Sequence, residues 1–121
     1  MRAAAILVAL ASACAQPMYR WGNYDQAVYQ HYRNPADHLA FVEKLGTIIR
    51  ENEQGGARMP PGCYAEYGWA LYEEGRFQEA SAFFEKEQKA WPESGVLMQK
   101  MIALANRSRS PGNARPAGVT R

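Results

Sequence analysis

The hydrophobic positions of this chain recur mostly at intervals of three and four residues, which is the spacing of an amphipathic helix. The clearest stripe has six members: Leu39, Phe41, Val42, Leu45, Ile48 and Ile49. Asn34 precedes the stripe as a candidate N-cap and Pro35 as a first helical residue, and Gly55–Gly56 follow it. The pattern therefore predicts a helix that begins at Pro35, ends at the glycine pair and buries one face.

The same spacing predicts four more helices. A short helix from about Asp25 to Arg33 lies in an aromatic-rich segment that runs from Pro17 to Tyr32. Two helices over 63–74 and 77–90 are joined by Gly75-Arg76, and Pro92 ends the second of them. A last helix over about 94–106 places three apolar residues on one side: Leu97, Met101 and Leu104. We therefore expect an all-α fold built from helical hairpins.

Residues 61–94 match the period and pattern of one tetratricopeptide repeat (TPR), which is 34 residues long. Small residues at Gly68 and Ala80 allow the two helices to approach each other. Aromatic and aliphatic residues fill the other consensus places: Tyr64, Tyr67, Leu71, Phe84 and Pro92. Glu87 departs from the pattern, since a small residue is usual there, and we expect this face to meet solvent or a partner. An earlier segment, Gly22–Ala27, partly repeats Gly75–Ala80. The chain thus holds about one and a half repeats, fewer than the three or so that an array needs to bury its core.

The N-terminus has the layout of a secretory signal, with one positive charge, an apolar run and then small residues over 1–13. Two cleavage sites compete. Residues 10–14 (LASAC) read as a lipobox, which predicts cleavage before Cys14, acylation of Cys14 and a lipidated linker over 14–18. Ala13-Cys14-Ala15 also reads as an A-x-A site, which predicts cleavage before Gln16 and a soluble chain. We favour the lipobox, and Ala15 after the cysteine then indicates the periplasmic face of the outer membrane.

Charge divides the rest of the chain into a helical domain over 19–106 and a basic tail over 107–121. The tail carries four arginines and no acid, lacks core-forming residues and is predicted to be disordered. The whole chain has a net charge of +2, which does not indicate nucleic-acid binding. Its 121 residues are enough for one domain.

Two long segments carry a family resemblance: WGNYDQAVYQHYRNP, and PPGCYAEYGWALYEEGRFQEASAFFEKEQKAWPES with the following VLMQKMI. Together with the lipobox, they resemble the small TPR-like bacterial outer-membrane lipoproteins of unknown function, over about Tyr19 to Ile102. In such families the gene often lies beside one for a curli-secretion-channel-like lipoprotein, so the resemblance implies a shared envelope assembly. It implies no catalytic residues.

The residues themselves favour no enzyme, metal or cofactor. His31 and His38 are seven residues apart with Pro35 between them, and no third ligand is evident, so we expect them to be solvated or at the edge of the core. Cys63 at a helix start is a candidate nucleophile, because a helix N-terminus lowers a thiol pKa, but a small buried residue is the favoured interpretation. Glu73 and Glu74 are adjacent on a helix and are expected to point apart.

We therefore expect a protein that binds other proteins. Trp69 and Tyr72 lie outside the consensus core of the repeat, and exposed Trp and Tyr often anchor interfaces. With Glu87, they are the predicted partner-binding residues. The leading hypothesis is a lipid-anchored assembly module of an envelope or secretion complex. The alternative is a soluble periplasmic module that binds a peptide or ligand.

Overall fold

The computed structural model describes residues 18–110, which form five α-helices and one 3₁₀ turn and contain no β-strand. The helices are α1 (Tyr24–Arg33), α2 (His38–Gln54), α3 (Cys63–Glu73), α4 (Phe77–Ala90) and α5 (Gly95–Arg109), and the 3₁₀ turn is η1 (Pro92–Ser94). This confirms the all-α prediction. The predicted signal peptide, Cys14 and the tail beyond residue 110 lie outside the described residues.

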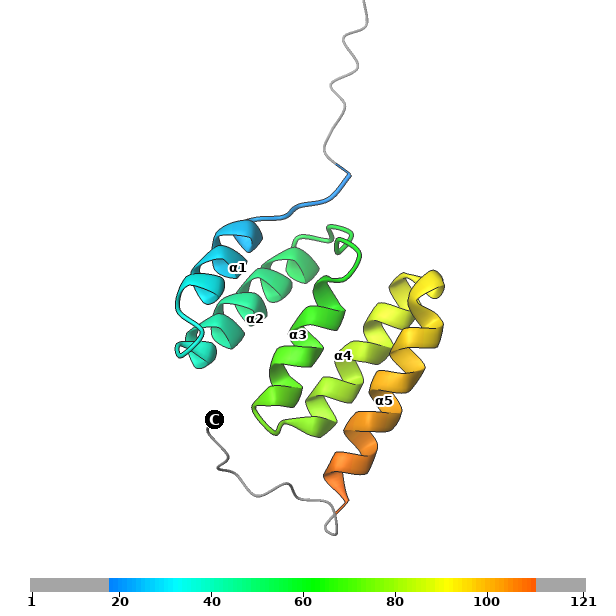
Figure 1. The fold of residues 1–121 in the computed structure, drawn as a ribbon. Helices are drawn as coiled ribbons and strands as arrows, with labels where there is room; N and C mark the ends of the chain where they lie inside the picture. Colours follow the sequence, from blue (N-terminus) through cyan, green and yellow to red (C-terminus); the bar gives the residue numbers. More distant parts are fainter. Residues whose placement is uncertain (1–17, 111–121) are drawn as a thin grey trace, which may run out of the picture.

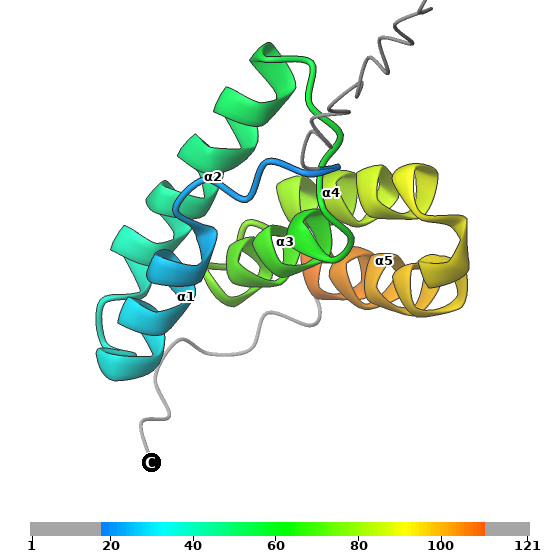
Figure 2. The same cartoon turned by 90° about the horizontal axis from the view of Figure 1, so that it is seen from above.

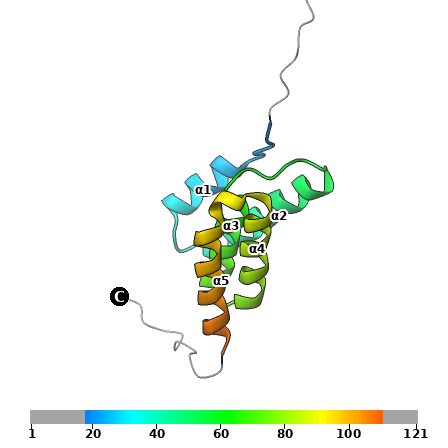
Figure 3. The same cartoon turned by 90° about the vertical axis from the view of Figure 1, so that its right-hand side faces the viewer.

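The helices form two groups (Figure 1). Helices α1 and α2 make one hairpin, and α3, α4 and α5 lie side by side as a second group, with α4 packed extensively on both α3 and α5. Figure 2 shows that α3 is the member of the second group nearest the first hairpin, and the contacts between α2 and α3 join the two groups. In Figure 3 the first hairpin runs at an angle to the other three helices.

The turn between α3 and α4 follows from Gly75, whose φ of 77° lies in the left-handed region that favours glycine. The Gly75 N–H donates to the Tyr72 carbonyl at 3.0 Å, and the Arg76 N–H donates to the Leu71 carbonyl at 2.9 Å. These two bonds are the Schellman arrangement that satisfies the last carbonyls of a helix. The chain can then reverse direction within two residues, as the sequence predicts.

The close crossing of α3 and α4 depends on Gly68. A Cβ atom at this position would lie 2.7 Å from Phe84 Cε1 and 3.2 Å from the Ala80 carbonyl oxygen. Phe84, Ala80 and the neighbouring Leu71 have no exposed surface. The small residues of the predicted hairpin therefore allow α3 and α4 to pack closely enough to bury Phe84 between them.

The core is continuous across both groups of helices. Helix α2 contributes one face of its apolar stripe, including the nearly inaccessible Leu45, while Tyr67 and Leu71 of α3 pack against the same cluster. The buried hydrophobic members are Ala27, Phe41, Val42, Leu45, Ile48, Ile49, Met59, Cys63, Tyr67, Ala70, Leu71, Ala80, Phe84, Met98 and Ala105.

The predicted start of α2 at Pro35 is wrong. Asn34 instead ends α1, because its N–H donates to the Gln30 carbonyl at 2.9 Å. Its own carbonyl accepts the Asp37 N–H at 3.1 Å, so residues 34–36 form a turn and α2 begins at His38. Leu39 consequently lies in the first turn of α2 with 64% of its surface exposed, outside the buried stripe.

Helix α5 differs from the prediction in its end and its buried face. It continues to Arg109, so residues 107–109 are helical and do not belong to a disordered tail. Met98 and Ala105 are the buried members of its inner face, whereas Leu97 is 58% exposed. Apolar residues occur on both flanks of this helix, and its packing against α4 selects the flank that contains Met98.

Residues 19–21 are held against the rest of the domain. The Arg20 carbonyl accepts a hydrogen bond from Asn52 Nδ2 at 2.7 Å. The Tyr19 ring packs edge-on against Trp91, with centroids 5.9 Å apart. The Arg58 guanidinium lies 4.2 Å from the centroid of the same Trp91 ring. The segment that leads into α1 is therefore fixed from Tyr19 onward.

Candidate functional site

Trp69 and Tyr72 form an aromatic platform on the surface of α3. Their rings stack with centroids 5.1 Å apart and planes 16° apart, as expected for residues three apart on a helix. Trp69 is 40% exposed, and Tyr72 is half-buried. The structure therefore brings these two predicted residues together.

Tyr72 is fixed from two further directions. Its hydroxyl pairs with Ser108 Oγ of α5 at 2.9 Å, and its ring packs against Phe77 of α4 with centroids 5.1 Å apart. Contacts with two other helices therefore hold the ring on which Trp69 stacks. A large aromatic surface that is already ordered loses little side-chain entropy on binding, which favours its use in an interface.

Glu87, the third predicted partner-binding residue, does not face solvent. It is 2% exposed, and its Oε1 accepts the backbone N–H of Gly62 at 2.7 Å. Gly62 is the N-cap of α3 and offers no side chain for the first turn. The Glu87 carboxylate of α4 thus accepts a hydrogen bond at the N-terminus of α3, across the hairpin. The prediction that Glu87 lies on a face that meets solvent or a partner is therefore wrong.

Cys63 is buried in the core and is poorly suited to be a nucleophile. Burial, followed by the nearby negative charge of Glu87, raises the pKa of its thiol to about 11. The helix N-terminus alone would lower the pKa, but burial and Glu87 outweigh it. The favoured interpretation of Cys63 as a small buried residue is the one that its surroundings support.

The two histidines meet although a turn separates them in sequence. Their ring centroids are 5.4 Å apart, and His31 stacks flat on Phe41 at 4.1 Å. His38 Nε2 lies 3.1 Å from the Ala70 carbonyl oxygen and 3.4 Å and 3.8 Å from carboxylate oxygens of Glu74 and Glu73. The expectation that these two glutamates point apart is therefore wrong for their carboxylates, because the flexible side chains converge on this imidazole nitrogen.

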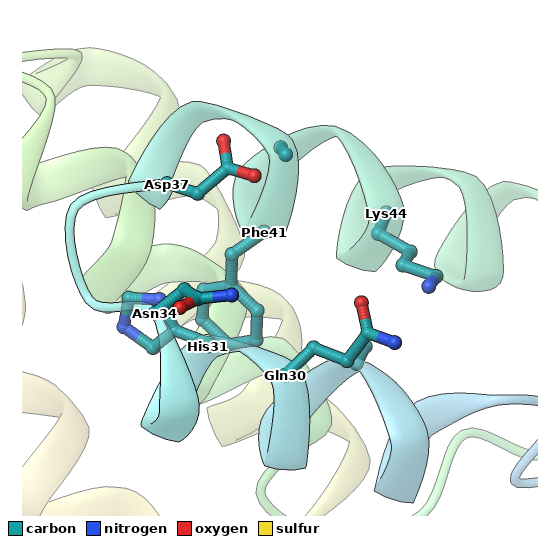
Figure 4. Close-up of a pocket in the computed structure, with 8 residues that line it drawn as sticks. Gln30, His31, Asn34, Asp37, Phe41 and Lys44 are labelled. Carbon is teal, nitrogen blue, oxygen red and sulfur yellow. The ribbon is translucent and has the colours of Figure 1, made fainter.

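A pocket of about 90 Å³ lies beside His31, between α1 and α2 (Figure 4). Its polar lining comes from Gln30, His31, Asn34, Asp37 and Lys44, and Phe41 lies over the His31 ring. Sites for drug-sized ligands usually occupy about 300–1,000 Å³, so this pocket admits little more than a few waters. Within residues 18–110, no group of three or more His, Cys, Asp or Glu side chains is placed to hold a metal ion.

The structure also displays an exposed surface that is not among the predicted sites. Three large aromatic residues on and before α1 are strongly exposed: Trp21 (46%), Tyr29 (59%) and Tyr32 (80%). The aromatic richness of residues 17–32 was the available signal, but the face that these aromatic residues occupy depends on how α1 packs on α2.

None of the helices in residues 18–110 combines the length and the apolar character that crossing a bilayer requires.

The search of curated proteins and the search of solved structures each found no match. A family model does match residues 18–101, which is most of the chain and nearly all of the described helices. The model is described as a domain of unknown function, DUF4810. The chain therefore belongs to the DUF4810 family of domains of unknown function.

Proposed function

We propose that this protein is a lipoprotein of the outer membrane, anchored on the periplasmic face through acylated Cys14, and that its helical domain binds another envelope protein. The anchor is supported by the lipobox-type sequence at residues 10–14. Two or more acyl chains hold a protein stably at a membrane, where a single chain does not. The domain would then act where envelope assemblies form.

The hairpin of α3 and α4 supports a TPR-like interpretation of residues 61–94. Gly68, Ala80 and Phe84 occupy the repeat's packing positions and make the close contact that these positions serve. Helix α5 packs beside α4, where the first helix of a following repeat would lie. Repeats of this kind present helix faces to other proteins, and a short array has open ends on which a partner can pack.

The observation that carries the proposal is the aromatic platform. Trp69 is exposed while its stacking partner Tyr72 is fixed by Ser108 and Phe77. Interface hot spots are enriched in Trp and Tyr, and an ordered platform of this kind fits the centre of a protein–protein interface. By family resemblance, the partner we propose is a curli-secretion-channel-like lipoprotein.

The test is recovery of the partner from detergent-solubilised membranes with tagged wild-type protein and with the Trp69→Ala variant. We expect at least about a tenfold loss of the co-purified envelope protein, since hot-spot truncations cost about 2 kcal/mol or more. Trp21→Ala is the matched control, because it removes a similarly exposed Trp (46% against 40%) from the segment just before α1 and should leave recovery unchanged.

Equal recovery with wild type and Trp69→Ala would contradict the role of the platform. Failure to recover any stable envelope partner would count against an assembly function. If the mature chain then fractionated with the soluble periplasm, the alternative of a peptide- or ligand-binding module would replace the proposal.

A further inference from the structure

One apolar surface of the domain remains uncovered, and it begins seven residues after Cys14 in the sequence. Trp21, Tyr24, Val28, Tyr29 and Tyr32 line a shallow, open depression along the outer side of α1, with Asp25 as its charged member. We call these five residues the α1 aromatic face. Three of them are exposed large hydrophobic residues: Trp21, Tyr29 and Tyr32.

The α1 aromatic face is ordered even though it is exposed. The Tyr24 hydroxyl donates to the Glu66 carboxylate of α3, and the Trp21 ring packs on Tyr24 with centroids 5.6 Å apart. Ala27 of α1 is buried in the core, and Tyr24 and Val28 of the face are partly buried against that core. The outward direction of the face is therefore set by the packing of α1, and the face is available to an external surface.

We propose that the α1 aromatic face rests on the phospholipid surface to which Cys14 anchors the protein. This inference depends on the proposed acylation of Cys14. The residue types support this placement, since Trp and Tyr are enriched where proteins meet the membrane–water interface, because their rings are apolar while the indole N–H and the hydroxyl stay hydrated.

The short distance along the chain between Cys14 and α1 also supports this placement. The chain is fixed to the domain from Tyr19 onward by the Tyr19–Trp91 contact and the Asn52 bond to the Arg20 carbonyl. Tyr19 is only five positions after Cys14 in the sequence, a span of at most about 18 Å when fully extended. An acylated Cys14 therefore keeps the start of α1 close to the bilayer, and Trp21 is two residues further along the chain.

The distribution of charged side chains also supports this placement. Arg20 and Arg33 flank the α1 aromatic face, and Arg33 Nη1 lies 3.4 Å from the Tyr29 hydroxyl. Residues 63–90, which form the α3–α4 hairpin, carry six acidic and three basic side chains. Residues 20–33 carry a net charge of +1, so an anionic membrane would attract this segment and repel the α3–α4 hairpin, which leaves the platform of Trp69 and Tyr72 free for a protein partner.

The test uses acylated protein purified from cell membranes and reconstituted into phosphatidylethanolamine–phosphatidylglycerol vesicles that contain brominated lipid. Trp69→Phe leaves Trp21 and the buried Trp91 as the emitters, and Trp69→Phe/Trp21→Phe leaves Trp91 alone. The difference between the two variants is the emission of Trp21. We expect brominated lipid to quench that emission and aqueous iodide to quench it little.

Two results would overturn the inference while leaving the anchor intact. In the first, the protein floats with the vesicles but Trp21 is quenched by iodide and not by brominated lipid, so the face points to water. In the second, neither reagent reaches Trp21, so a second copy or another protein covers the face. Flotation and the mass of the Cys14 peptide report the anchor separately. A chain without acyl groups would overturn both the anchor and the placement that depends on it.

Discussion

Replacing Gly68 with alanine tests the packing of the α3–α4 hairpin most directly. The added Cβ would lie 2.7 Å and 2.8 Å from two atoms of the Phe84 ring and 3.2 Å from the Ala80 carbonyl oxygen. Phe84 is fully buried and Ala80 contributes backbone, so neither neighbour can turn away into solvent. The helices must therefore separate, or the Phe84 ring must leave its place in the core.

The magnitude follows from two opposing effects. Alanine is a better helix former than glycine by about 1 kcal/mol, which favours the variant. Overpacking a tight core costs about 1–3 kcal/mol, and contacts this short with buried neighbours belong in the upper part of that range. We expect Gly68→Ala to lower the free energy of unfolding by about 1–2 kcal/mol, with a loss in Tm of about 4–8 °C for each kcal/mol.

The assay is urea unfolding followed by circular dichroism, with Gly95→Ala as the control. A Cβ at Gly95 would come no closer than 3.8 Å to any neighbour, so this variant should be neutral or slightly more stable. The loss from Gly68→Ala should also shrink when it is combined with Phe84→Leu, because the ring that collides is gone. A Gly68→Ala protein as stable as wild type, or a loss that does not change with Phe84→Leu, would refute the reasoning.

Three further predictions concern buried groups. Glu87→Ala should lower the free energy of unfolding by about 1–3 kcal/mol, because the Gly62 N–H loses its acceptor, whereas Glu87→Gln retains an acceptor and should cost less in the same urea titration. Cys63 should react with iodoacetamide far more slowly in the folded protein at pH 8 than in urea, as peptide mass spectrometry can measure, because its pKa is raised to about 11. Burial raises the pKa of Glu66, so its contribution to stability is present below the unfolded-state pKa and lost as pH rises through the folded-state value. Stability measured from pH 4 to pH 7 should therefore fall less in Glu66→Gln than in wild type.

Most of the helices could be predicted because their signals are local. Gly75 requires a left-handed backbone, and the apolar spacing around Leu45 needs only a helical period. The start of α2 could not be predicted, because Asn34 can cap the helix before it as well as the one after it. The inner face of α5 was also ambiguous, because Leu97 and Met98 are both apolar and only the packing against α4 decides between them.

The candidate site was predictable only where exposure follows from the helix itself. Trp69 lies outside the packing positions of the hairpin, and it is exposed. Glu87 is buried where its carboxylate accepts the N–H of Gly62 at the N-terminus of helix α3, which is 25 residues earlier in the sequence. That pairing depends on how α3 and α4 cross. The meeting of His31 with His38 likewise depends on the turn that brings α2 back along α1.

The two proposed surfaces assign separate roles to two exposed tryptophans. Trp69 should matter for partner recovery and not for membrane contact, whereas Trp21 should matter for membrane contact and not for partner recovery. They lie on different segments, Trp69 on α3 and Trp21 in the residues just before α1. Variants at the two positions can therefore be compared in the same strain and should fail in different assays.

The mass of the mature N-terminus tests the central claim most directly. Peptide and intact mass spectrometry of protein from expressing cells should find a chain that begins at Cys14 and carries acyl groups there. That result would fix the domain to a membrane through a short linker. An unmodified chain that begins at Gln16 would contradict the account, because it removes the anchor on which both the location and the membrane-facing role of α1 depend.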